Sequence, residues 1–112
     1  METYYDPADL AKFSSDGIGS YASDAWANFM SYYGPVYADG ALTSREKHLI
    51  AVGVAAALQC PYCIDAHTQS CVSLGCDGDQ LMEAFHVAAT IRAGATMAHG
   101  VQALPIIEEG EL

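Results

Sequence analysis

The stretch Gln59-Cys60-Pro61-Tyr62-Cys63-Ile64-Asp65-Ala66-His67-Thr68 decides the fold that we expect for this chain. Pro61 has no backbone N–H and is favoured at the first position of a helix, but it would clash inside a continuous one. Cys60 is therefore predicted to be a boundary residue, with a new helix running from Pro61 to Leu74. Gly75 then suits the left-handed position at the helix end.

The preceding segment predicts the other half of a helix pair. Thr43-Ser44-Arg45-Glu46 fits a capping box, which marks a helix N-terminus. The predicted helix runs to about Gln59. Because Leu49 to Leu58 is apolar on almost all sides, we expect this helix to be buried.

The remaining segments also predict helices. Asp6-Pro7 is a good helix start, and this helix is expected to reach about Ser15. A second helix is expected from Tyr21 to Tyr33, stopped by Gly34-Pro35. One face of it carries an apolar stripe of Ala22, Trp26, Phe29, Met30 and Tyr33.

The C-terminal third predicts one long helix. Asp77-Gly78-Asp79-Gln80 caps it, and it is expected to continue through Ala98 and end near Gly100. The tail, Leu104 to Leu112, is expected to be frayed or docked on a neighbour. No segment alternates with period two, so we expect an all-α fold in a single domain over residues 1–112.

The composition limits the classes of partner that we expect for this 112-residue chain. It is 52% hydrophobic and 16% charged, which is apolar for so small a domain and predicts a homo-oligomer with apolar surface between subunits. The formal net charge of −10 argues against nucleic acid and anionic membranes as partners. Leu49 to Leu58 is too short to span a membrane, and the N-terminus lacks the features of a signal peptide. We therefore expect a cytoplasmic protein.

The Cys-x-x-Cys pair points to thiol chemistry. At the start of a helix, free N–H groups and the helix dipole stabilise a thiolate, and this argument makes Cys60 the attacking sulfur. His67 lies one helical turn beyond Cys63 and could take its proton, and this second argument makes Cys63 the attacking sulfur. The sequence leaves open which sulfur attacks. After attack on a peroxide or disulfide, the other sulfur can close a Cys60–Cys63 disulfide, which an external thiol must reduce.

A zinc site is the non-catalytic alternative. Cys60, Cys63, His67 and Cys71 could in principle make a Cys₃His set in a zinc-binding or oligomeric scaffold module. However, Cys71 lies about 12 Å of helix rise beyond Cys63, too far for one metal without distortion.

Residues 42–100 resemble the alkylhydroperoxidase D-like branch of the carboxymuconolactone decarboxylase family. The matching pattern is the capped helix Leu42–Val52, then Cys60–Thr68, then Arg92–Gly100. The resemblance implies an all-helical homotrimer or homohexamer built on a central helical hairpin. It also implies a thiol-dependent peroxidase or disulfide oxidoreductase with a hydroperoxide or other small-molecule substrate, a thiol or dithiol reductant protein, and no metal or organic cofactor.

The resemblance also implies roles for individual residues. In the family, the position of Cys63 attacks the peroxide, that of Cys60 resolves the intermediate, and that of His67 belongs to a proton relay. The relay commonly includes a glutamate twelve residues before the first cysteine, where this chain has His48. Either His48 takes the relay role as an imidazole base, or peroxidase activity is weak. A cofactor-free lactone decarboxylase, as in the other branch of the family, is a second candidate, although that chemistry does not need two thiols.

The other candidate residues have weaker support. Tyr62 could donate a hydrogen bond to a bound peroxide, and His99 could line the site or an interface, although a cation at a helix C-terminus is the simpler interpretation. His86 and Cys71 are interpreted as structural. The remaining aromatic residues are expected to cover the core or line a substrate channel: Tyr21, Trp26, Phe29, Tyr32, Tyr33 and Tyr37.

Overall fold

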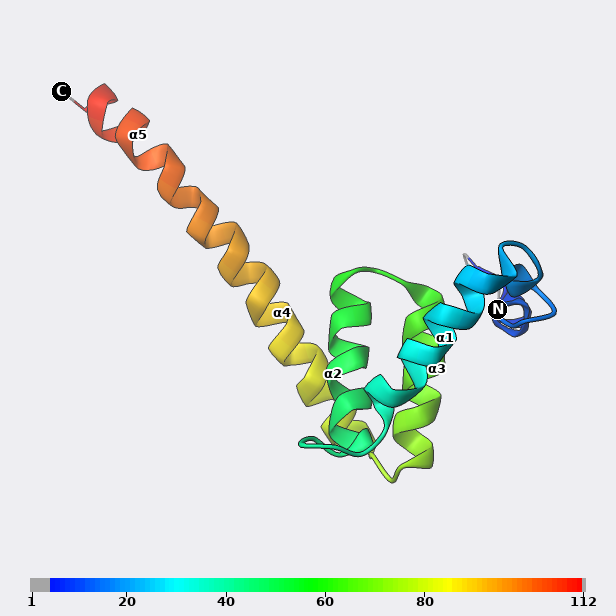
Figure 1. The fold of residues 1–112 in the computed structure, drawn as a ribbon. Helices are drawn as coiled ribbons and strands as arrows, with labels where there is room; N and C mark the ends of the chain where they lie inside the picture. Colours follow the sequence, from blue (N-terminus) through cyan, green and yellow to red (C-terminus); the bar gives the residue numbers. More distant parts are fainter. Residues whose placement is uncertain (1–4, 112) are drawn as a thin grey trace.

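The fold is all-α, as predicted, in a computed structural model that describes residues 5–111 (Figure 1). Every regular element in this range is a helix. In chain order the elements are η1 (Pro7–Lys12), η2 (Ile18–Ser20), α1 (Ser23–Tyr37), α2 (Ser44–Ala57), α3 (Pro61–Ser73), α4 (Gly78–Gly100), η3 (Val101–Ala103) and α5 (Leu104–Gly110).

The predicted hairpin of α2 and α3 forms, with both capping boxes. Thr43 Oγ1 accepts the Glu46 N–H at 3.1 Å, and Glu46 Oε1 accepts the Thr43 N–H at 3.0 Å. Asp77 and Gln80 make the same pair of bonds at the start of α4. These reciprocal bonds satisfy N–H groups that have no partner inside a helix, so they fix where α2 and α4 begin.

The turn between α2 and α3 places the first cysteine. The helix α2 ends at Ala57, two residues earlier than expected, because Gln59 adopts a left-handed conformation with φ of +59°. The Cys60 N–H then donates to the Ala55 carbonyl at 3.0 Å. This bond closes the C-terminus of α2, and it leaves Cys60 as the N-cap of α3, as predicted.

A similar turn ends α3 and joins it to the core. Gly75 has φ of +88°, and the Cys76 N–H donates to the Cys71 carbonyl at 2.9 Å. The side chains of Cys71 and Cys76 are both buried, in one cluster with Val52 and Leu81. The predicted structural role of Cys71 fits this position. The core therefore lies where α2, α3 and the first turns of α4 meet.

Two predicted helix boundaries near the N-terminus are wrong. The first segment forms the 3₁₀ helix η1, capped by the Asp6 carboxylate, and it ends at Lys12 rather than Ser15. The next helix, α1, does not stop at Gly34-Pro35 but continues to Tyr37. Pro35 removes one backbone hydrogen bond and its ring crowds the preceding turn, and the packing of the last turn of α1 on the hairpin outweighs this cost. Tyr37, in the last turn, stacks on two histidines of the hairpin.

The C-terminal third projects from the body, and α2 is less buried than expected. α4 continues through η3 into α5 as a rod that points away from α1, α2 and α3 (Figure 1). The predicted frayed tail is instead helical up to Gly110, with Leu112 outside the described residues. The radius of gyration is 19.1 Å, against about 13 Å for a compact chain of this length. Ile50 and Val54 of α2, and Leu58 directly after it, are exposed because no described part of the chain covers them.

Within residues 5–111, no helix combines the length and the apolar character that crossing a membrane requires.

Candidate functional site

The two cysteines of the Cys-x-x-Cys pair lie in direct contact at the start of α3. Cys60 Sγ is 2.7 Å from Cys63 Sγ and accepts the Cys63 backbone N–H at 3.3 Å. Both are free thiols, with Cys60 partly buried and Cys63 exposed. Because Cys60 is the N-cap residue, its sulfur occupies the position where a side-chain oxygen normally receives the free N–H groups of the first turn.

The surroundings of the two sulfurs shift their pKa values in opposite directions. Hydrogen bonds from the Cys63 thiol and the Cys63 backbone N–H lower the pKa of Cys60, because they stabilise its thiolate. Burial, and after it the contact with Cys60, raises the pKa of Cys63 to about 11. Cys60 is therefore the sulfur that ionises first, in agreement with the argument from the helix dipole.

A pair of histidines lies behind the dithiol. His67 Nδ1, on α3, is 3.0 Å from His48 Nδ1, on α2, and His67 Nε2 is 3.3 Å from the Tyr33 hydroxyl on α1. His48 is thus in direct contact with His67, as a member of a relay must be. Among the described residues, no hydrogen bond joins His67 to either sulfur. Both of its ring nitrogens are instead occupied by Tyr33 and His48.

Two tyrosines of α1 cover the histidine pair. The Tyr37 ring stacks on His48 and His67, with centroid distances of 4.7 and 5.0 Å, and the Tyr33 ring lies 6.3 Å from that of His67. From the sequence, both tyrosines are expected only to cover the core or line a substrate channel. Their spacing of four residues was the available signal, but the expected stop at Gly34-Pro35 placed Tyr37 outside the helix.

The pKa shifts in this cluster favour neutral side chains. Burial lowers the pKa of His48, and burial together with the nearby His48 lowers that of His67. Burial also raises the pKa of Tyr33 and of Tyr37, and the negative charge of a Cys63 thiolate adds to both shifts. At neutral pH the pair can therefore accept a proton, and the two phenols stay protonated.

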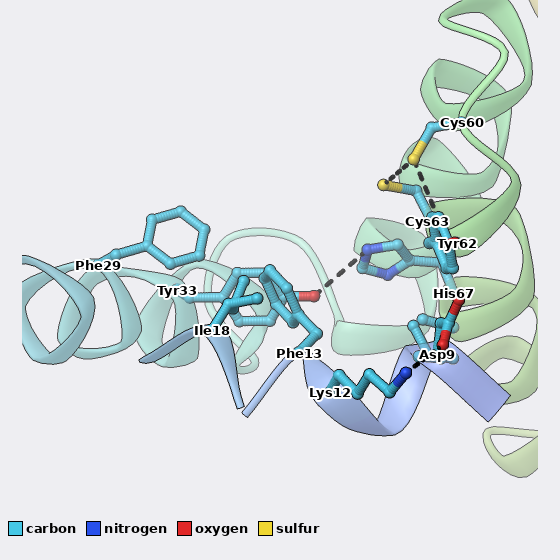
Figure 2. A pocket seen from close by; sticks show the side chains of 12 residues that line it. Asp9, Lys12, Phe13, Ile18, Phe29, Tyr33, Cys60, Tyr62, Cys63 and His67 are labelled. Atoms are coloured by element: carbon cyan, nitrogen blue, oxygen red, sulfur yellow. Dashed lines mark hydrogen bonds and ion pairs between the residues drawn. The ribbon is translucent and has the colours of Figure 1, made fainter. Parts of the chain in front are cut away.

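The dithiol opens into two hollows. One is a cavity of about 550 Å³ between α3, α1 and the N-terminal segment, and Figure 2 shows Cys60, Cys63, Tyr62, Tyr33 and His67 around it. The Lys12–Asp9 ion pair lies at this cavity, and its other walls are mostly apolar. The remaining lining residues are Asp9, Leu10, Lys12, Phe13, Ile18, Phe29 and Ala66. The second hollow, of about 370 Å³, is lined by the same two cysteines and His67, by mostly apolar residues of α2 together with Lys47, and by the end of α1.

Of the remaining candidate residues, Tyr62 lies at the site, whereas His99 and Cys71 lie away from it. Tyr62 lines the larger cavity beside the sulfurs. His99 lies on the projecting part of α4, outside both hollows, where its ring contacts Gln102. In the described part of the chain, no three His, Cys, Asp or Glu side chains are grouped as a metal site would require. The Cys₃His zinc set is therefore not assembled, and Cys71 is buried in the core instead.

Comparisons with known proteins agree with this architecture. Residues 24–105 match the model of the carboxymuconolactone decarboxylase family. A protein of Paracoccus denitrificans described as "uncharacterized protein 4 in cox locus" is 47% identical over 102 residues, covering 91% of this chain and 89% of that protein.

Two solved structures, each 32% identical to this chain, share the fold. A Methanobacterium thermoautotrophicum protein has a TM-score of 0.71, covering 74% of this chain and 93% of its own. A carboxymuconolactone decarboxylase family protein from Legionella pneumophila has a TM-score of 0.65, covering 91% and 87%.

Proposed function

The chain belongs to the carboxymuconolactone decarboxylase family, and we propose that it is a thiol-dependent oxidoreductase that reduces hydroperoxides, or a related disulfide substrate, through Cys60 and Cys63. The observation that carries this proposal is the 2.7 Å contact between the two sulfurs at a helix N-terminus that opens into an apolar cavity. A dithiol in this position has one sulfur ready to attack and the other within reach of the product.

The proposed reaction begins at Cys60, the sulfur with the lowered pKa. Its thiolate attacks the terminal oxygen of the hydroperoxide, so that an S–O bond forms, the O–O bond breaks and the alcohol leaves with one added proton. The Cys63 thiol then attacks the resulting sulfenic acid, and the S–S bond forms as water leaves. Two electrons pass from the sulfurs to the peroxide. This order reverses the roles that the family resemblance implies for the two cysteines.

The other partners follow from the chemistry. The disulfide must be reduced by an external thiol or dithiol protein, for which we propose the reducing cytoplasm as the setting. The proposed substrate is a hydroperoxide with an apolar substituent, because the cavity beside the sulfurs is large and mostly apolar.

We also propose that the working form is a homo-oligomer, a trimer or hexamer. The projecting rod of α4 and α5 exposes large apolar side chains along its length: Met82, Val87, Ile91, Met97, Val101, Leu104, Ile106 and Ile107. The body adds Ile50 and Val54 of α2, and Leu58 directly after it. A second copy of the chain would remove these surfaces from water, and the small core within one chain supplies little stability without it.

The test of the proposal is an assay of cumene hydroperoxide consumption with dithiothreitol as the thiol donor. The assay compares wild type with Cys60→Ser and Cys63→Ser. Cys76→Ser is the control, because it removes a thiol outside the site. We expect the first two variants to lose turnover and the control to retain it. Dimedone should trap a sulfenic acid on Cys60 in the Cys63→Ser variant. Trapping on Cys63 in Cys60→Ser alone would return the attacking role to Cys63. Turnover that persists in both site variants would refute the proposal, and decarboxylation of carboxymuconolactone in the same preparations would then favour the other branch.

A further inference from the structure

Tyr33 makes a hydrogen bond with the Nε2 nitrogen of His67, and the direction of this bond depends on the tautomer of the ring. The distance from its hydroxyl to Nε2 is 3.3 Å, and Figure 2 shows the hydroxyl directed at the imidazole. Tyr33 also lines the larger cavity together with both cysteines. It therefore lies on the boundary between the cavity, where a proton must be released, and the pair that can hold it.

The 3.0 Å contact between His48 Nδ1 and His67 Nδ1 constrains both tautomers. One nitrogen must carry a hydrogen and the other a lone pair, so two neutral imidazoles can meet in only two ways. If His67 carries its proton on Nδ1, then Nε2 is an acceptor for Tyr33. If His67 carries it on Nε2, then the Tyr33 proton has no acceptor among the hydrogen bonds of the described residues. The first arrangement gives the Tyr33 hydroxyl an acceptor and leaves only the His48 Nε2–H, at the far side of its ring from His67, without a partner among the described residues. The second leaves the Tyr33 hydrogen facing the mostly apolar walls of the cavity.

We propose that Tyr33 is a positioning residue that fixes His67 in its Nδ1–H form and His48 in its Nε2–H form, so that the histidine pair can take up the proton of Cys63 through the Tyr33 hydroxyl. This inference rests on the dithiol chemistry proposed above. As the Tyr33 oxygen receives a proton from the cavity side, it passes its own to His67 Nε2. The resulting imidazolium has both N–H groups accepted, one by Tyr33 and one by His48.

The relay serves the step that closes the disulfide. Cys63 has a raised pKa and so does not ionise unaided. Its proton leaves Sγ, is held at His67 Nε2, and is returned to the hydroxide that leaves the Cys60 sulfenic acid as water. The titratable and charged groups that share a hollow or a contact with His67 come from four elements: Tyr33 and Tyr37 of α1, His48 and Lys47 of α2, Cys60, Cys63 and Tyr62 at the start of α3, and Asp9 and Lys12 of η1.

The test uses a pair of matched variants. Tyr33→Phe removes the hydroxyl that bonds His67 and keeps the ring. Tyr37→Phe removes a hydroxyl that makes no hydrogen bond within the described residues and keeps the ring that stacks on both histidines. ¹H–¹⁵N NMR correlations of the histidine rings at pH 7.5 report the tautomers directly, without any need for activity.

We expect wild type and Tyr37→Phe to share one tautomer pattern, and Tyr33→Phe to move His67 toward Nε2–H. In peroxide turnover, Tyr33→Phe should lower kcat by about tenfold with KM unchanged, and the Cys60 sulfenic acid trapped by dimedone should live correspondingly longer. A Tyr33→Phe tautomer pattern identical to that of wild type would overturn the inference. Absent peroxidase activity with the expected tautomer shift would instead refute only the proposed function.

Discussion

His48 Nδ1 lies 3.0 Å from His67 Nδ1, so two imidazoles meet where related proteins are expected to pair an imidazole with a carboxylate. A carboxylate would hold a positive charge on its partner. A second imidazole supplies no such negative charge, and burial, followed by the nearby His48, lowers the pKa of His67. His67 therefore stays neutral, and able to accept a proton, further into the acidic range.

Replacing His48 by glutamate should move the working pH range upward. The carboxylate stabilises the protonated form of His67, so its pKa rises and the acid limb of the activity profile shifts to higher pH. His48→Ala leaves the His67 Nδ1–H without its partner, and we expect kcat to fall by about tenfold or more. NMR titration of His67 checks the first effect independently of turnover. An unchanged titration in His48→Glu would contradict this account of the pair.

Mild acid should destabilise the protein through the same two residues. Both histidines have folded-state pKa values below the ordinary value of about 6.5, so the unfolded chain takes up protons first as pH falls. Their contribution is complete above that value and is lost as pH falls through the lower folded values. Urea unfolding between pH 8 and pH 5 should show a declining free energy of unfolding, with a smaller slope in a His48→Gln, His67→Gln double variant. An equal slope in both proteins would assign the effect to other groups.

The turn at Gly75 supports the end of α3, and alanine there should be costly. The residue has φ of +88°, and an added Cβ would meet no atom within 4 Å, so backbone conformation alone decides the effect. We expect Gly75→Ala to lower the free energy of unfolding by about 1 to 2 kcal/mol. Gly78→Ala, which also meets open space but has no left-handed φ, should change it by less than about 0.5 kcal/mol. Equal effects in denaturant titrations would show that φ is not the cause.

Assembly should depend on the apolar face of α4. Ile91 is 69% exposed and Met97 is 75% exposed, so aspartate at both positions costs little in a single chain but would place charges in an interface between copies. Sedimentation velocity should find wild type as an oligomer and the double variant as smaller species. Glu108→Gln is the control, because its site on α5 is already exposed and polar. A wild type that sediments as a monomer at micromolar concentrations would contradict the proposed oligomer.

Local signals gave the starts of α2, α3 and α4 correctly. The capping boxes at Thr43 and Asp77 are complete within four residues of sequence, so no distant contact is needed to form them. Pro61 also acts locally, since its fixed φ and missing N–H suit the first helical position directly after the N-cap Cys60. The contact between the two cysteines follows from this start, because an N-cap side chain reaches back to the third residue of its own helix.

Local signals failed where distant packing decided the outcome. Gly34-Pro35 predicts a helix end, but α1 continues to Tyr37. The stacking of Tyr37 on two histidines of the α2–α3 hairpin outweighs the cost of a proline inside the helix. The same error separated Tyr37 from Tyr33, although both lie on α1 with their rings near His67. Likewise, the apolar run of α2 predicts that the helix is buried, but it does not identify the segment that would cover it. Within the described residues, Ile50 and Val54 of this helix stay exposed.

The sequence by itself determined an all-α chain with a dithiol at a helix N-terminus, because periodicity, caps and proline act over a few residues. Only the tertiary structure decided what surrounds that dithiol. His48, His67 and Tyr33 come from three different helices. The His48–His67 bond requires the hairpin of α2 and α3, and the Tyr33–His67 bond requires α1 to pack against it. The pKa values of these groups depend on burial and on neighbours distant in sequence, which no local pattern encodes.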